Sequence, residues 1–164
     1  MTEGPSHCLV IGIGNPDRGD DAAGRAVARW LRGVLPPQIG ILEHDGEATS
    51  LLARLEGAEI VCLIDASASA APAGTVRRFD VAAAPLPQGA FGVSTHGLGL
   101  AEAIELARAL GQLPARCIVY AVEGASFGPG EPLTPPVAAA VPEVGRRVQA
   151  ELAGVAAPGG WLDA

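Results

Sequence analysis

A short acidic, glycine-rich loop between a strand and a helix constrains this chain more than any other feature. The loop is Gly12-Ile-Gly-Asn-Pro-Asp-Arg-Gly-Asp-Asp21, and it follows the apolar run Cys8–Ile11. Apolar residues at helical spacing come next, at Ala23, Val27, Trp30 and Leu31. In an α/β chain a loop in this position lies at the carboxyl edge of the sheet, where ligands usually bind. The sequence therefore predicts a ligand site that includes this loop.

The composition of the loop indicates the kind of ligand. Gly12 and Gly14 resemble the start of a dinucleotide-binding loop, but Asp17 stands where the third glycine is needed. Pro16 lacks a backbone N–H that a phosphate would use, and the carboxylates of the loop would repel a pyrophosphate. A cation suits the loop better. One of the aspartates is equally well explained as a helix cap, because a carboxylate there accepts hydrogen bonds from free backbone N–H groups.

The rest of the chain alternates between expected strands and helices. Strands are predicted at residues 7–13, 39–42, 58–64, 74–81 and 116–122, and helices at 20–34, 49–55, 94–110 and 137–148. Apart from Glu59, the run 58–64 is apolar, which is typical of a central parallel strand, whereas Arg77 and Arg78 mark an exposed edge strand. Pro142 is expected to kink or interrupt the last helix. We therefore expect one α/β domain over residues 1–164, with three layers and a mostly parallel sheet.

Two stretches within the domain are expected to be long loops. Residues 82–93 contain several proline and glycine residues and no periodicity, so we expect a mobile, rather apolar loop there. Residues 124–136 form the second loop, and the tail at 158–164 is expected to be loose.

Composition argues against several classes of function. The formal net charge of −7 argues against nucleic acid or an anionic membrane as a partner. We find no signal peptide and no apolar run long enough to span a bilayer. Cys8, Cys62 and Cys117 lie singly in apolar runs without the spacing of metal ligands, which indicates buried thiols in a reducing compartment. We therefore expect a cytoplasmic protein.

Two further polar residues are expected at the same edge as Asp21. Asp65 ends the apolar strand 58–64, where a carboxylate is costly unless it is paired, capped or bound to a cation. His96 stands at a predicted helix start, where it is either incidental to the cap or functional. Together Asp21, Asp65 and His96 offer two oxygens and one nitrogen, which suits a divalent transition ion with open coordination positions. An open position is what a Lewis acid or a metal-bound hydroxide needs.

Three other residues are candidates for contact with a substrate. His44 and Asp45 end another predicted strand at this edge, either as part of a surface loop or as a contact made through Asp45 and Gly46. Asp20 is expected to cap the helix or to support the neighbouring carboxylate, and it is the third candidate for substrate contact.

A second motif suggests a different chemistry. Gly124-Ala-Ser-Phe-Gly128 fits the G-x-S-x-G nucleophile elbow and follows a predicted strand. The elbow needs a helix next, but Pro129-Gly-Glu-Pro132 follows instead. The acids and histidines with obvious roles also precede the serine in the chain, whereas in the fold that uses this elbow the serine comes first. A serine hydrolase that uses Ser126 is therefore the weakest of the hypotheses.

Taken together, the motifs resemble the nickel–iron hydrogenase maturation endopeptidases. The resemblance rests on Gly12-Ile-Gly-Asn-Pro, Arg18-Gly-Asp-Asp21, Asp65, Ser94-Thr-His-Gly-Leu98 and Leu133-Thr-Pro-Pro-Val137, in that order over nearly the whole chain. Two places depart from the family pattern. Residues 45–49 read Asp-Gly-Glu-Ala-Thr where the family often has Asp-Gly-Gly-Thr, and Ala121-Val-Glu123 replaces Gly-Ile-Glu or Gly-Ile-Gln.

The resemblance implies both a fold and a task. The fold is a sheet of about five strands with helices on both faces. The task is removal of a C-terminal extension from the hydrogenase large-subunit precursor once nickel is in place. Asp21, Asp65 and His96 would be the catalytic residues and would contact nickel carried by the precursor rather than held permanently by this protein. The alternative is a non-catalytic, nickel-checking module that binds the immature large subunit.

Overall fold

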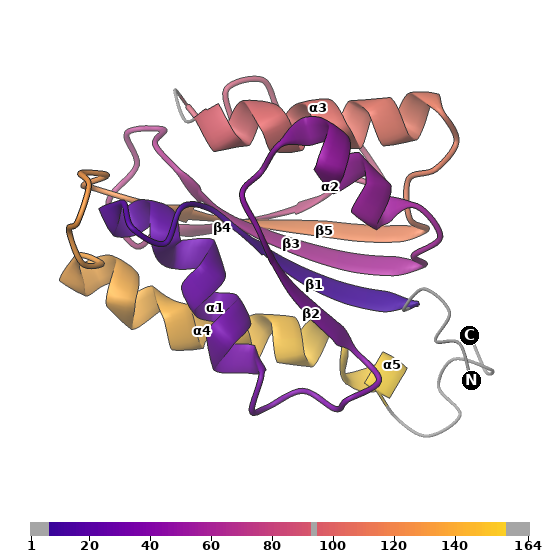
Figure 1. The fold of residues 1–164 in the computed structure, drawn as a ribbon, viewed down its shortest axis with the longest axis horizontal. Helices are drawn as coiled ribbons and strands as arrows, with labels where there is room; N and C mark the ends of the chain where they lie inside the picture. The colour runs from indigo at the N-terminus through magenta and orange to yellow at the C-terminus, as the bar shows by residue number, and fades with distance from the viewer. Residues whose placement is uncertain (1–6, 93–94, 157–164) are drawn as a thin grey trace.

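The computed structural model describes residues 7–92 and 95–156, and Figure 1 shows its three layers. A five-stranded sheet forms the middle layer, in the order β2-β1-β3-β5-β4. Its strands are β1 (Cys8–Ile13), β2 (Gly40–His44), β3 (Ile60–Ser67), β4 (Val76–Asp80) and β5 (Arg116–Glu123). The first three and β5 are parallel to one another, and β4 pairs antiparallel with β5 at the edge. The predicted three-layer α/β/α class with a mostly parallel sheet is confirmed.

Helices cover both faces of the sheet. On one face α1 (Ala23–Leu31) packs against α4 (Pro135–Glu151), and on the other α2 (Ala48–Leu55) packs against α3 (Thr95–Ala109). A short 3₁₀ turn, η1 (Gly19–Ala22), precedes α1, and α5 (Ala153–Ala156) follows α4. No helix in the described part of the chain is long and apolar enough to cross a membrane.

The two faces of the core are built by alternate residues of the same strands. In β1, Cys8 and Val10 pack with α1 and α4, whereas Leu9, Ile11 and Ile13 pack with α2 and α3. Every residue of β1 is buried, because helices cover both of its sides. Strands buried on both faces read as continuous apolar runs, which explains why the central strands were predictable from sequence.

Several element boundaries differ from the sequence-based prediction, and two of the differences lie at the site. The helix predicted from residue 20 starts as η1 and becomes α-helical only at Ala23. The strand predicted to stop at residue 64 continues to Ser67, because β5 pairs with it as far as Ser67 opposite Glu123. Asp65 therefore lies inside β3 rather than directly after it. The tail at 158–164 and the end of the 82–93 loop fall outside the described residues.

The predicted interruption at Pro142 is wrong. Pro142 lies inside α4, which runs as one helix from Pro135 to Glu151. The missing backbone N–H costs one hydrogen bond, but Val141 and Val144 on either side are buried in the core that α4 shares with α1. Burial of these apolar side chains offsets the cost.

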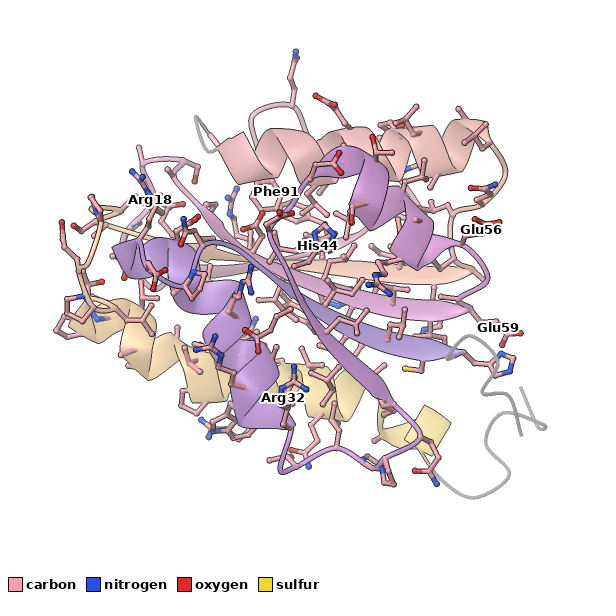
Figure 2. All side chains as sticks on the ribbon, in the orientation of Figure 1. Arg18, Arg32, His44, Glu56, Glu59 and Phe91 are labelled. Carbon is pink, nitrogen blue, oxygen red and sulfur yellow. The ribbon has the colours of Figure 1, made fainter. Side chains whose placement is uncertain are left out.

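The topology points to one edge of the sheet as the site. The chain runs from β1 through α1 to β2 on one side, and then through α2 to β3 on the other side of β1. Ligands of such open sheets bind at this switch point, outside the carboxyl ends of the strands. Arg18 and Phe91 lie toward this end of the molecule in Figure 2, and Glu56 and Glu59 lie at the opposite end.

Candidate active site

Asp21 is held at the end of β1 by the glycine-rich loop. The residue is 5 % exposed, and its Oδ2 accepts a 2.9 Å hydrogen bond from the Asn15 N–H. Gly14 has a φ of +144°, and a side chain there would collide with the backbone carbonyl of Asp21. The chain therefore needs glycine at position 14 to fold back and place this carboxylate over the strand end.

Asp65 lies in β3 just beyond the end of the β1–β3 ladder. The last pair of that ladder is Gly12 opposite Ile64, and Asp65 is the next residue. It is fully buried, and its Oδ1 accepts a 2.8 Å hydrogen bond from the Ala66 N–H. The predicted carboxylate thus lies at the carboxyl end of the β1–β3 ladder, although it is inside β3 and not after it as the sequence suggested.

The elements that carry the two aspartates touch each other. η1, which contains Asp21, packs against β3, which contains Asp65. Gly24 makes this close approach possible, because a Cβ there would collide with the carbonyls of Ile13 and Ile64. The structure thus brings both predicted carboxylates to the switch point between β1 and β3.

The third predicted site residue, His96, is the second residue of α3, and its side chain lies outside the described part of the structure. The start of α3 is nevertheless placed by its backbone. A Cβ at Gly99, the fifth residue of the helix, would collide with the carbonyl of Gly46 in the loop after β2. The start of α3 therefore lies at the same edge of the sheet as the two aspartates.

A complete metal-binding set cannot be assembled from the described side chains alone. Among them, no group of three or more His, Cys, Asp and Glu residues is placed to hold a metal ion. The predicted set includes His96, whose side chain is not described. The metal-contacting role of Asp21, Asp65 and His96 therefore stays a prediction.

Asp20 has a structural role in place of the substrate contact suggested by sequence. It is fully buried, and Oδ2 accepts hydrogen bonds from the Ala125 N–H at 2.8 Å and the Ser126 N–H at 3.1 Å. The backbone N–H and the hydroxyl of Thr134 donate to Oδ1 and Oδ2 at 2.7 and 2.8 Å. Both oxygens are thus occupied by the loop between β5 and α4, and Asp20 fastens that loop to η1.

The G-x-S-x-G motif does not form a nucleophile elbow. The hydroxyl of Ser126 donates a 2.5 Å hydrogen bond to the carboxylate of Glu131. No helix begins after the serine until Pro135, so the strand–turn–helix that exposes the serine in that motif is missing. The structure gives the serine-hydrolase hypothesis no support.

His44 stabilises the loop after β2 as a neutral imidazole. Its Nδ1 accepts a 2.9 Å hydrogen bond from the Gly46 N–H, so the ring proton lies on Nε2, which is 2.9 Å from Ser50 Oγ. Burial is the main cause that lowers the pKa of His44 below its usual value. The Asp45 carboxylate lies 3.5 Å from Nδ1, but the unprotonated nitrogen makes no ion pair with it.

Asp45 and Glu47 shape the same loop after β2. The side chain of Asp45 is 73 % exposed, and its pKa is lowered mainly by the hydrogen bond that it accepts from the Glu47 N–H. Glu47 in turn caps α2, since its carboxylate accepts hydrogen bonds from the N–H groups of Thr49 and Ser50. The chain has Glu47 where the family pattern Asp-Gly-Gly-Thr has its second glycine, and this helix cap gives Glu47 a physical role.

Glu123 is a buried carboxylate with no role in the sequence-based prediction. It ends β5 and is 1 % exposed. Its Oε1 accepts hydrogen bonds from the hydroxyls of Ser67 and Ser69 at 2.9 and 2.7 Å, and its Oε2 accepts one from the Ser69 N–H at 2.8 Å. The sequence carries a signal for this residue, because an acid that ends an apolar strand was the signal used for Asp65.

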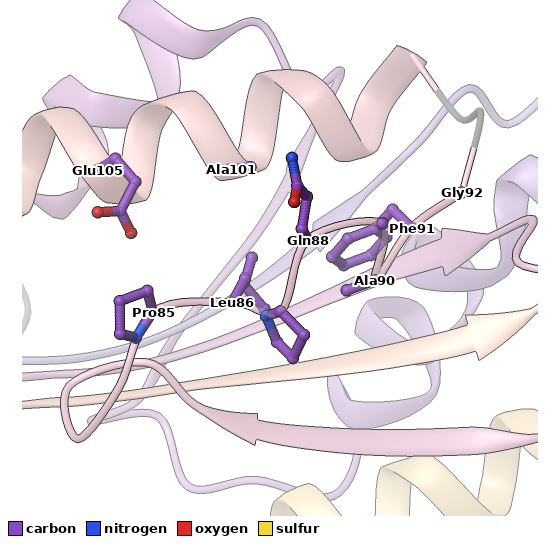
Figure 3. A pocket seen from close by; sticks show the side chains of 10 residues that line it. Pro85, Leu86, Gln88, Ala90, Phe91, Gly92, Ala101 and Glu105 are labelled. Atoms are coloured by element: carbon purple, nitrogen blue, oxygen red, sulfur yellow. The ribbon is translucent and has the colours of Figure 1, made fainter.

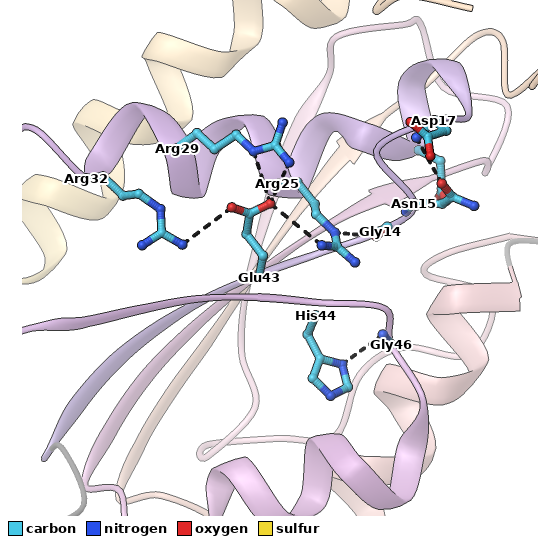
Figure 4. A network of polar contacts seen from close by, with 10 residues as sticks. Gly14, Asn15, Asp17, Arg25, Arg29, Arg32, Glu43, His44 and Gly46 are labelled. Carbon is cyan, nitrogen blue, oxygen red and sulfur yellow. Dashed lines mark hydrogen bonds and ion pairs between the residues drawn. The ribbon is translucent and has the colours of Figure 1, made fainter. Parts of the chain in front are cut away.

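A cluster of arginines on α1 and at its C-cap holds β2 beside the loop (Figure 4). The carboxylate of Glu43 lies 3.7, 2.9 and 3.4 Å from the guanidinium groups of Arg25, Arg29 and Arg32. The hydrogen bond from Arg29 is the main cause that lowers the pKa of Glu43. Arg25 also donates a 2.6 Å hydrogen bond to the carbonyl of Gly14. These contacts fix α1, β2 and the acidic loop relative to one another.

Comparison with known proteins matches the sequence and the fold of this chain to one family. The family model for hydrogenase maturation proteases, HycI, matches residues 31–151. The chain belongs to the hydrogenase maturation protease family. Proteases of this family are hydrolases that act on peptide bonds.

Individual relatives agree with the family assignment. The hydrogenase expression/formation protein HupD of Thiocapsa roseopersicina is 31 % identical over 117 residues, which are 70 % of this chain and 53 % of HupD. The chain thus matches about half the length of that curated relative. The hydrogenase maturating endopeptidase HybD from E. coli has 28 % identity and a TM-score of 0.77 over 89 % of this chain and 91 % of its own. The [NiFe] hydrogenase maturation protease HycI from Thermococcus kodakarensis has 25 % identity and a TM-score of 0.64, over 87 % and 90 % of the two chains.

Proposed function

We propose that this protein is an endopeptidase that removes the C-terminal extension of a nickel–iron hydrogenase large-subunit precursor after nickel insertion. Family membership supports the reaction class, and the names of the similar proteins support hydrogenase precursors as substrates. The observation that carries the proposal is the placement of Asp21 and Asp65 at the switch point, with the start of α3 at the same edge. We place the reaction in the cytoplasm, where the buried thiols remain reduced.

In this proposal the nickel of the precursor belongs to the substrate, and Asp21, Asp65 and His96 contact it. Two carboxylate oxygens and one imidazole nitrogen leave coordination positions open on the ion. Bound there, the ion polarises the scissile carbonyl or activates a water molecule. One of the two carboxylates serves as the general base. Asp45 and Gly46, which lie beside the start of α3, contact the precursor chain.

The test is mass spectrometry of a nickel-loaded large-subunit precursor, incubated with and without the purified protein. We expect release of a C-terminal peptide only when both nickel and this protein are present. An intact precursor that forms a stable complex with the protein would instead identify a nickel-checking module. If the precursor is neither cleaved nor bound by the protein, the proposal is overturned for that precursor.

Variants of the site test the residue assignment. Asp21→Asn, Asp65→Asn and His96→Gln are each expected to slow cleavage by about 100-fold or more while the protein stays folded. Asp17→Asn is the matched control, because Asp17 belongs to the same loop but is exposed. Cleavage by all three variants at the control rate would show that the assignment is wrong.

A further inference from the structure

A pocket lies between the loop at 85–92 and α3 (Figure 3). Its volume is about 450 Å³, within the range of roughly 300–1,000 Å³ typical of ligand sites. The side chains that define it are Leu86, Gln88, Ala90 and Phe91 from the loop and Ala101 and Glu105 from α3. Of the proposed catalytic residues whose side chains the structure describes, Asp21 and Asp65, neither lines it.

The chemistry of the pocket suits an apolar group. Leucine, alanine, phenylalanine and proline side chains make up most of its lining. The charged residue of the lining, Glu105, lies 3.1 Å from Arg108 on the same helix, so its charge is offset. Because the lining presents more apolar than polar surface, an apolar side chain is favoured over a charged one.

Hydrogen bonds from the sheet hold the loop that forms the pocket. The N–H of Ala68, the residue after β3, donates a 3.1 Å hydrogen bond to the carbonyl of Phe91. The guanidinium group of Arg77 on β4 donates to the carbonyl of Ala90 and lies 5.6 Å from the ring centre of Phe79. Ala90 and Phe91 are only 6 % and 5 % exposed. A preformed pocket of this kind loses little conformational entropy when it binds a ligand.

The pocket adjoins the proposed active site along two elements. Ala68, which pairs with Gly92 of the pocket lining, follows Asp65 by three residues, or about 10 Å of extended chain. On α3, Ala101 follows His96 by five residues, or roughly 7.5 Å along the helix axis. One polypeptide segment bound across the carboxyl edge can therefore reach both places.

We propose that this pocket binds an apolar side chain of the precursor, about three residues from the scissile bond. The inference rests on the proposed function, because that function places a polypeptide chain across the neighbouring edge. The pocket then selects the precursor by the apolar character of that one position, while the nickel site reads the state of its metal centre.

The first test fills the pocket. Ala101→Trp places a large side chain in it from a helix position, and Ala109→Trp is the matched control on an exposed position of the same helix, outside the pocket. We expect kcat/KM for the nickel-loaded precursor to fall at least tenfold in the first variant, mainly through KM, and less than twofold in the control. Equal kinetics for the two folded variants would overturn the inference.

The second test does not depend on cleavage or on Ala101→Trp folding. The ¹⁵N-labelled native protein is titrated with N-acetyl-Leu-Leu-amide and, as a control, with N-acetyl-Asp-Asp-amide. We expect the amides of Gln88, Ala90, Phe91 and Ala101 to shift with the first peptide only. Equal shifts with both peptides, or no shifts with either, would overturn the pocket inference. The proposed function would remain valid in that case if the native protein cleaves the precursor. Shifts with the apolar peptide, without cleavage of the precursor, would overturn the proposed function and leave the pocket as an apolar peptide site.

Discussion

Asp20 and Asp21 are neighbours in the chain, yet their carboxylates bond to different parts of the molecule. Asp21 accepts a hydrogen bond from Asn15 of the acidic loop, whereas Asp20 accepts its bonds from residues more than 100 positions away. A sequence shows two adjacent acids and cannot show which carboxylate is used in hydrogen bonds that hold the fold together. The contacts with Ala125 and Thr134 give Asp20 a structural role, and Asp21 stays the member of the pair that we propose to contact a ligand.

Asp20→Asn should destabilise the protein. The amide has nearly the same shape, but its NH₂ group would face backbone N–H donors that now point at a carboxylate oxygen. Leaving a buried donor unsatisfied costs about 2 kcal/mol, so we expect the free energy of unfolding in urea to fall by that amount. Asp17→Asn, at an exposed position, should change it by less than about 0.5 kcal/mol. Equal losses in the two variants would contradict the structural role of Asp20.

His44 should make stability depend on pH. Burial lowers its pKa in the folded protein, so the unfolded chain binds a proton at a higher pH than the folded one does. The stabilisation from neutral His44 is therefore complete above about pH 6.5 and is lost as the pH falls through the pKa of the folded state. The loss is at most about 1.4 kcal/mol per pH unit. His44→Gln should flatten the curve of unfolding free energy between pH 7 and 5, and an unchanged slope would contradict the assignment.

At the scale of elements, a second polar cluster ties α4 to the edge of the sheet opposite the site. Glu151, at the end of α4, lies 2.9 Å from Arg78 of β4 and 3.0 Å from Arg116 of β5. It also accepts a 2.9 Å hydrogen bond from the hydroxyl of Tyr120, and its hydrogen bond with Arg78 is the main cause that lowers its pKa. One carboxylate thus joins a helix to the two strands at that edge.

Glu151→Gln should loosen this junction. Neutralising the carboxylate removes charge-assisted hydrogen bonds, each worth about 1.5–3 kcal/mol, so we expect the free energy of unfolding to fall by about 2 kcal/mol. Glu143→Gln, at an exposed position of the same helix, is the control and should be nearly neutral. Cleavage of the precursor should persist in both variants, because neither residue lies at the carboxyl edge. A neutral Glu151→Gln would show that the cluster adds no stability.

At the scale of the whole molecule, buried cysteines lie in both halves of the core, on either side of the sheet. Cys8 and Cys62 are buried on the face covered by α1 and α4, and Cys117 is buried on the face covered by α2 and α3. Burial raises the pKa of Cys8 to about 11 and that of Cys117 to about 12, so reactive thiolate is scarce at neutral pH. Neither side of the sheet exposes its thiols unless its helices move.

We expect the three thiols of the native protein to react with a thiol reagent at one slow rate, equal to the rate of global unfolding. The two faces share the strands of one sheet, so opening of one should accompany opening of the other. Labelling followed by mass spectrometry, with increasing urea, would measure the rates. Faster modification of Cys117 alone would show that the layer of α2 and α3 opens independently.

Most of the fold was predictable because its signals are local. Continuous apolar runs predicted β1, β3 and β5, and the two arginines of 74–81 predicted an edge strand, which is observed as β4. The errors lie where distant residues decide. Pairing with β5 extends β3 past Asp65, and packing against α1 keeps α4 continuous through Pro142.

The sequence by itself determined the class of the fold and which residues could carry the chemistry. Alternation of strands and helices selects the three layers, and parallel strands place Asp21 and Asp65 at one edge, because their carboxyl ends meet there. The start of α3 reaches that edge because the chain after the antiparallel strand β4 runs back along the sheet, where Gly92 bridges to Ala68. Only the tertiary structure decided the division of labour among the acids and the existence of the apolar pocket. Burial and hydrogen-bond partners depend on residues far apart in the chain, such as Asp20 with Thr134 and Ala68 with Phe91. No local pattern encodes those contacts.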